Sequence, residues 1–235
     1  IRRSAPPVHV RLTAGIPVNR LALALLLIAV TLTRLPLLSH GYGADPDAWR
    51  VAATAHRLWT TGTYEVSRYP GYPLHELVSA PLAGLGGAAA SNGATLVVAL
   101  LLIVVWNRMA LREAHHPALL VLTLALTPLF LRNSATTMDY VWSMLFVLLA
   151  LDRALCGRAL VAGALMGVAA GFRLSNLVAL VPVSVALLGQ TPGCPVDHRF
   201  LRPARDHMSI PSRAVLQSAL GIGAAYDLDQ LLYPV

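Results

Sequence analysis

Long apolar stretches alternate with short polar loops along most of the chain. The first, LALALLLIAVTLTRLPLLSH at residues 21–40, is long enough to cross about 30 Å of hydrocarbon as a helix. Arg34 lies near its far end, where its side chain can reach the membrane interface. Further apolar stretches follow at 93–107, 117–131, 140–151, 159–171 and 175–189. The pattern predicts an all-α fold, a polytopic bundle of five or six transmembrane helices.

The apolar stretch 77–106 is interrupted by GLGGAAASNG at 84–93. It fits either an interfacial helix followed by one crossing at about 93–107, or a tight hairpin of two crossings. The next loop carries Arg108 and Arg112, and arginines concentrate in cytoplasmic loops. The single crossing is therefore favoured, and every expected inside loop then holds two or more arginines.

The longest polar loop of the expected bundle, residues 40–76, lies on the outer face. Within it, DPDAWRVAATAHRLWTTG predicts a short helix that Asp45 or Asp47 caps. Its apolar stripe comprises Ala48, Val51, Ala52, Ala55, Leu58 and Trp59. Such a helix beside a span indicates one that lies in the membrane interface. TGTY and YPGYP mark turns on either side of Arg68.

Composition agrees with a membrane protein and excludes several other classes. Mean hydropathy is +0.63 and 12% of residues are charged, against about 25% in soluble domains. The net charge of +7 comes from 18 arginines and no lysine, spread singly between apolar segments, so nucleic-acid binding is not expected. Two isolated cysteines argue against a zinc site or a disulfide scaffold.

These features divide the chain into three parts. Residues 1–20 are expected to be a cytoplasmic N-terminal segment, and 21–190 a transmembrane domain with its outer loop at 40–76. Residues 191–235 form a polar, Pro- and Arg-rich tail with a weak last helix, and a truncated end is one reading of it. The expected location is a bacterial plasma membrane, with the N-terminus cytoplasmic and membrane lipids as neighbours.

Carboxylates and arginines gather on the expected outer face. A carboxylate such as Asp45 or Asp47 can take a proton from a hydroxyl or hold a divalent cation such as Mg²⁺ or Mn²⁺. An arginine can donate two hydrogen bonds to a phosphate. Each residue also has a structural alternative: the acids, Asp139 included, can cap helices, the arginines can anchor headgroups, and YPGYP can be a rigid turn.

The order of features resembles the N-terminal part of GT-C-type membrane glycosyltransferases, which include protein O-mannosyltransferases and lipid A aminoarabinose transferases. The similar stretches are TRLPLLSHGYGADPDAWRVAATAHRLWTTGTY (33–64), SRYPGYPLHELVSAPLAGLGG (67–87) and MDYVWSMLFVLLALDRALCGRALVAGALMGVAAGFRLSN (138–176). In that family a first span leads to a long outer loop that begins with an acidic motif. Here a proline separates the two acids, which are adjacent in the family.

The resemblance implies transfer of a sugar from a polyprenyl-phosphate donor to an extracytoplasmic acceptor. Asp45 would be the catalytic carboxylate, or the metal ligand if a metal takes part, with Asp47 as second choice. Arginines would bind the donor phosphate, and substrate contacts are expected from Arg68, Arg173, Arg132, Tyr69, Tyr72, Glu76 and Asp139. The alternatives are a small transporter or flippase-like protein and a non-catalytic assembly subunit. A transferase predicts that Asp45, Arg68 and Arg173 converge on one outward cavity.

Overall fold

The computed structural model describes residues 20–189, and within them all regular structure is helical, which confirms the all-α prediction. The helices are α1 (Arg20–Arg34), η1 (Leu35–Leu37), α2 (Pro46–Thr61), α3 (Pro73–Glu113), α4 (Pro117–Leu126), α5 (Pro128–Asn133), α6 (Tyr140–Leu155), α7 (Ala159–Phe172), η2 (Leu174–Ala179) and α8 (Leu180–Leu188). The predicted N-terminal segment and tail lie outside this range, apart from a few boundary residues.

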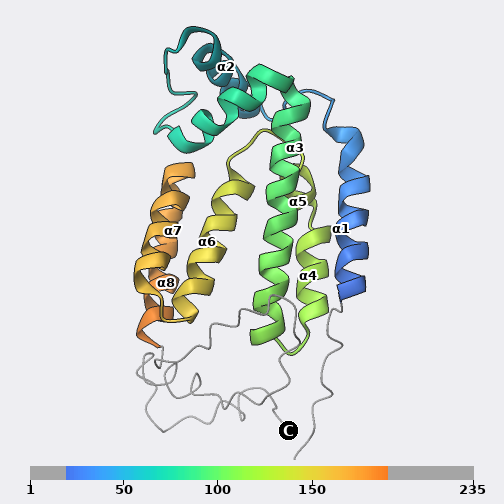
Figure 1. The fold of residues 1–235 in the computed structure, drawn as a ribbon, viewed down its shortest axis with the longest axis vertical. Coiled ribbons are helices and arrows are strands. Elements are labelled where there is room, and N and C mark those ends of the chain that lie inside the picture. The colour runs from blue at the N-terminus through green and yellow to red at the C-terminus, as the bar shows by residue number, and fades with distance from the viewer. Residues whose placement is uncertain (1–19, 190–235) are drawn as a thin grey trace, which may run out of the picture.

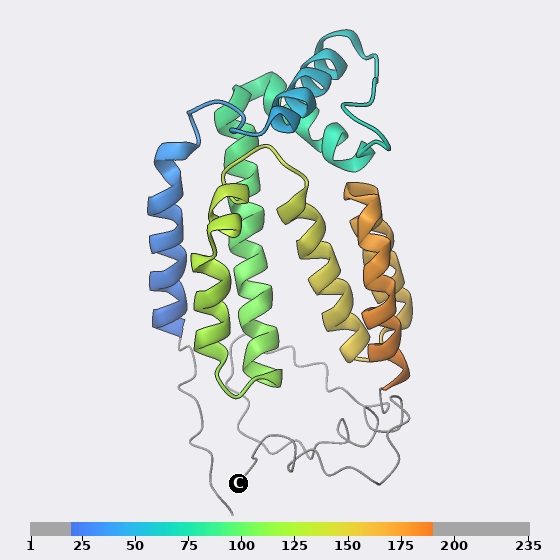
Figure 2. The same cartoon turned by 180° about the vertical axis from the view of Figure 1, so that it is seen from behind.

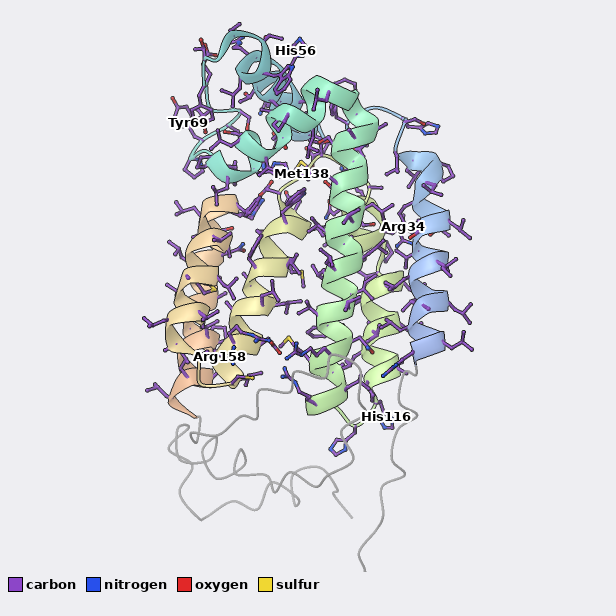
Figure 3. All side chains as sticks on the ribbon, viewed as in Figure 1. Arg34, His56, Tyr69, His116, Met138 and Arg158 are labelled. Carbon is purple, nitrogen blue, oxygen red and sulfur yellow. The ribbon has the colours of Figure 1, made fainter. Side chains whose placement is uncertain are left out.

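The long helices lie side by side, and the polar loop 40–76 covers one end of them (Figure 1). α1, α4, α6, α7, α8 and the second part of α3 run along the bundle, whereas α2 and the first part of α3 lie across its end (Figures 1 and 2). The turns that hold His116 and Arg158 lie at the opposite end (Figure 3). The loops expected on one membrane face thus share one end of the molecule.

Two helical segments are long and apolar enough to cross a membrane, Arg20–Leu37 and Pro73–Arg112. They indicate membrane association by their length and composition. The other apolar helical segments are shorter: Pro117–Leu126, Ala159–Phe172 and Leu174–Leu188.

α3 changes direction at Gly87, whose backbone adopts φ 59° and ψ −146°. Glycine suits this position because a side chain would strain a positive φ. The preceding part of α3 packs near α2, where the Trp59 ring lies against Gly84. The following part runs the length of the bundle as one helix (Figure 1). The stretch after Gly87 is one continuous helix, so the structure has a bend where the tight hairpin was the alternative. That this helix crosses a membrane once stays a prediction.

The apolar core has two main clusters. The larger one joins α1, α3, α4 and α6 around Leu102, Ile103 and Val121. The second joins α6, α7 and α8 and contains Ala150, Ala154, Ala162, Met166 and Val183. Its small side chains let the backbones of α6 and α7 approach closely.

From its position near the end of the first apolar stretch, Arg34 was expected to extend to the membrane interface. The structure shows that this expectation is wrong. The Arg34 side chain is only 3% exposed and points into the bundle (Figure 3). Nη2 donates to the carbonyl of Ala125 at 3.0 Å and Nε to Ser134 Oγ at 3.3 Å. The helix breaks before Pro128, which cannot continue the hydrogen-bond pattern, so late α4 carbonyls need other donors. Arg34 supplies one.

Candidate functional site

The first acidic residue of the loop begins α2. Asp45 is the N-cap, and its Oδ1 accepts a hydrogen bond from the backbone N–H of Asp47 at 3.0 Å. Pro46 occupies the first helical position, where its missing N–H costs no hydrogen bond. The proline between the two acids therefore has a local structural reason. Most of the predicted apolar stripe is buried, although Trp59 is about half exposed.

Asp139 is the centre of a cluster of charged side chains at this end of the bundle. It is fully buried, with 0% exposure. Its Oδ1 lies 2.6 Å from Arg68 Nη2 and its Oδ2 lies 2.8 Å from Arg173 Nη1. Asp139 occupies the N-cap position of α6, but its side chain makes no capping hydrogen bond. The capping alternative for this carboxylate is therefore wrong, because both oxygens face arginines.

Tyrosine rings hold the two guanidinium groups from the other side. The Cζ atom of Arg68 lies 4.2 Å from the centre of the Tyr72 ring, and that of Arg173 lies 4.3 Å from the centre of the Tyr140 ring. These are cation–π distances. Burial alone would lower the pKa of Arg68, but the hydrogen bond with Tyr72 and the charge of Asp139 raise it. Both arginines are thus fixed in place and charged.

The acids of the first loop extend this cluster outward. Asp47 Oδ2 lies 3.4 Å from Arg68 Nη1, and Asp47 Oδ1 lies 3.3 Å from Arg50 Nη1. Asp45 Oδ2 lies 3.7 Å from Arg132 Nη2, an arginine of the second loop. Both carboxylates remain about one-third exposed. Solvent can therefore reach them, whereas Asp139 is covered.

Asp45 faces a different arginine from the pair on Asp139. Arg68 and Arg173 meet directly on Asp139, while Asp45 pairs with Arg132 and connects to the others through Asp47. The residues expected to converge do gather at one end. A shared outward cavity for them stays a prediction.

Glu76 and Tyr69 are placed differently from the other expected contact residues. Glu76 is fully buried and accepts hydrogen bonds from the Tyr64 hydroxyl at 2.5 Å, from the Ser67 backbone N–H at 3.0 Å and from the Ser67 hydroxyl. It therefore fixes the segment that carries Arg68. Tyr69 is 91% exposed, at the outer side of the loop (Figure 3).

Sequence reasoning did not identify Tyr140 as part of the site. The only available pattern was its place directly after Asp139 in MDYVW, which says nothing about a ring stacked on an arginine 33 residues later. His75, next to Glu76, is also buried and packs its ring against Trp142 and Phe172. It belongs to a cluster of buried aromatic rings next to Glu76.

A metal centre at Asp45 lacks a set of protein ligands. Between residues 20 and 189, no three side chains of His, Cys, Asp or Glu gather closely enough to hold an ion. The carboxylates instead face arginines, whose positive charges disfavour a cation. The residues present therefore do not fit a resident divalent metal.

Comparisons with protein-family models, with curated proteins and with solved structures found no match to this chain.

Proposed function

We propose that this chain is a polytopic membrane glycosyltransferase of the GT-C type that takes a sugar from a polyprenyl-phosphate donor. The observation that supports it most is the pair Arg68 and Arg173, held on Asp139 from two separate loops. They lie at the same end of the bundle as the partly exposed carboxylates Asp45 and Asp47. An anion site beside a proton acceptor is what transfer from a phosphate-linked donor requires.

The arginines would bind the donor phosphate. Four arginines, Arg50, Arg68, Arg132 and Arg173, face three aspartates, so the cluster retains an excess of positive charge. The Tyr72 and Tyr140 rings limit the freedom of two of the guanidiniums, and this preorganisation reduces the entropy lost on binding. A phosphodiester would be held where its negative charge grows as the sugar leaves.

Asp45 would act as the base. Its Oδ1 accepts a hydrogen bond from the backbone N–H of Asp47, while Oδ2 lies 3.7 Å from Arg132 Nη2 on a side chain that is about one-third exposed. This oxygen takes the proton of the acceptor hydroxyl as the hydroxyl oxygen bonds to the anomeric carbon. The bond between that carbon and the phosphate oxygen breaks, and polyprenyl phosphate leaves with both electrons toward Arg68 and Arg173. Asp47, which pairs with Arg68, is the second candidate for the base.

The proposed setting is a bacterial plasma membrane, with the N-terminus cytoplasmic and the loop 40–76 outside. The alternating helices place the arginine-bearing turns near His116 and Arg158 at the end opposite the site (Figure 3). This agrees with the bias of arginines toward the cytoplasm. A transporter would need a polar path within the bundle, but the break in α3 at Gly87 lies at the bundle end (Figure 1).

Transfer of radiolabelled sugar from polyprenyl-phosphate donors by membranes containing the chain tests the proposal. Asp45→Asn should abolish transfer at unchanged protein level if Asp45 is the base. The matched control is Glu65→Gln, an exposed carboxylate that pairs with Arg57 away from Asp139. Equal loss in both variants, or transfer that survives in Asp45→Asn and Asp47→Asn, would contradict the proposed chemistry. Absence of transfer by the unaltered chain would favour the assembly-subunit alternative.

A further inference from the structure

On the α7 side, the length of the bundle between its charged ends is shorter than the hydrocarbon core of a bilayer is thick. Arg158 and Arg173 flank α7 and are 15 residues apart, a rise of about 22 Å along a helix. On the neighbouring α6, Asp139 and Asp152 are 13 residues apart, or about 20 Å. The hydrocarbon core of a typical bilayer is about 30 Å thick.

The opposite side of the bundle is longer. α1 and η1 together comprise 18 residues, Arg20–Leu37, which rise about 28 Å when the last turn is a 3₁₀ helix. The short apolar length is therefore a property of one side of the molecule.

Two charged groups at opposite ends of the short side are held by contacts within the bundle and cannot extend far along its axis. Arg173 is fixed by Asp139 at 2.8 Å and by the Tyr140 ring. Asp152 is buried at the other end of α6, within ion-pair range of three arginines: Arg108, Arg112 and Arg153. Snorkelling, the usual way for a short helix to fit a thick bilayer, needs mobile side chains.

The same side presents apolar side chains outward over its whole length. Along η2 and α8 the exposed side chains are Val178, Val181, Val185 and Leu188, from the Arg173 end to the opposite end of the bundle. Leu160, near the start of α7 at that opposite end, is 91% exposed. An apolar face of this extent needs a cover. Charged layers at both of its ends fit lipid, which has acyl chains in the middle and polar headgroups at both surfaces.

We propose that the α7–α8 face thins the bilayer locally and fits a hydrocarbon layer of about 20–22 Å. Lipids with short acyl chains are its preferred neighbours. This inference rests on the proposed membrane location but is independent of sugar transfer. It adds a consequence for that site: the headgroups on this side descend to the level of Arg173, so a lipid phosphate reaches the arginine without leaving its leaflet.

The test is the thermal stability of the purified chain in phosphatidylcholine bilayers whose acyl chains increase from about 14 to about 22 carbons. The unfolding temperature should be highest in the shortest chains and should fall as the bilayer thickens. Arg158→Leu moves one charged boundary outward, so its optimum should shift to longer chains. Arg57→Leu is the matched control, since Arg57 is exposed on α2 and pairs with Glu65, outside the apolar belt. Its optimum should stay in place.

An optimum at 18 or more carbons, or stability independent of chain length, overturns the inference. So does a stable dimer whose thermal stability follows protein concentration, because a second copy would then cover the face. Extraction of the chain from membranes by alkaline carbonate would overturn both this inference and the membrane location. Loss of sugar transfer alone would count only against the proposed enzyme.

Discussion

Replacing Asp139 with asparagine tests the centre of the charged cluster. The change keeps the size of the side chain but removes the negative charge that Arg68 and Arg173 share. Both guanidiniums would then face each other across a neutral amide in a largely covered position. The structure therefore predicts a loss of stability from an unbalanced buried charge, with little change in packing.

The expected magnitude follows from burial. Removing one partner of a buried ion pair costs about 3–5 kcal/mol. Arg68 and Arg173 keep some exposure and their tyrosine contacts, so the lower end, about 3 kcal/mol, is expected. For a domain of this size that corresponds to a fall of about 6–12 °C in the unfolding temperature. Asp47→Asn is the control, and its one-third exposed carboxylate should cost below about 1 kcal/mol.

Thermal unfolding in detergent micelles, followed by near-ultraviolet circular dichroism, measures both variants. The double variant Asp139→Asn with Arg173→Gln removes one of the two stranded charges. It should be less destabilised than the sum of the single changes, with a coupling of about 1–3 kcal/mol. Additive effects, or a loss in Asp139→Asn no greater than in Asp47→Asn, would refute the reasoning.

Two further predictions concern the loop and its support. Burial and the hydrogen bond to Glu76 raise the pKa of Tyr64 to about 12. This favours the protonated phenol, so its contribution to stability is complete below about pH 10 and is lost as pH increases through about 12. In an ultraviolet titration Glu76→Gln should move one tyrosine toward an ordinary pKa, and an unchanged curve contradicts the assignment. Separately, a Cβ on Gly84 would lie 2.3 Å from the Trp59 ring, whereas one on Gly93 meets nothing within 4 Å. Thermal unfolding should therefore show that Gly84→Ala lowers the free energy of unfolding by about 1–3 kcal/mol, whereas Gly93→Ala raises it by about 0.5–1 kcal/mol. Similar effects at both positions would contradict the close packing of Trp59 on Gly84.

Local patterns in the sequence predicted much of the helical arrangement. The loop sequence predicted a short helix capped by Asp45 or Asp47, and α2 begins at Pro46 with Asp45 as its N-cap. The interruption at 84–93 and the arginines at 108 and 112 favoured a separate first helix followed by one long helix, and α3 bends at Gly87 and then continues as a single helix. These features depend on residues close together in the sequence, so they can be predicted without a structure.

The ion pairs and hydrogen bonds within the site could not be predicted in the same way. Asp139 meets Arg68 over 71 residues and Arg173 over 34, distances along the chain that no periodicity encodes. Glu76 is adjacent to exposed-looking loop residues, yet its carboxylate is buried by Tyr64 and Ser67. The position of Arg34 was predicted wrongly because the carbonyl that accepts its hydrogen bond, at the break after α4, lies more than 90 residues later in the sequence.

The two buried aspartates of α6 restrict how this sequence can change over evolution. Asp139 and Asp152 are 13 residues apart, and each faces its own group of arginines on neighbouring elements. Inserting or deleting one residue between them would turn one end of the helix by about 100° relative to the other. One aspartate would then lose its arginines and face an apolar side chain. Related sequences should therefore keep this interval at 13 residues, and length changes should collect in the loops.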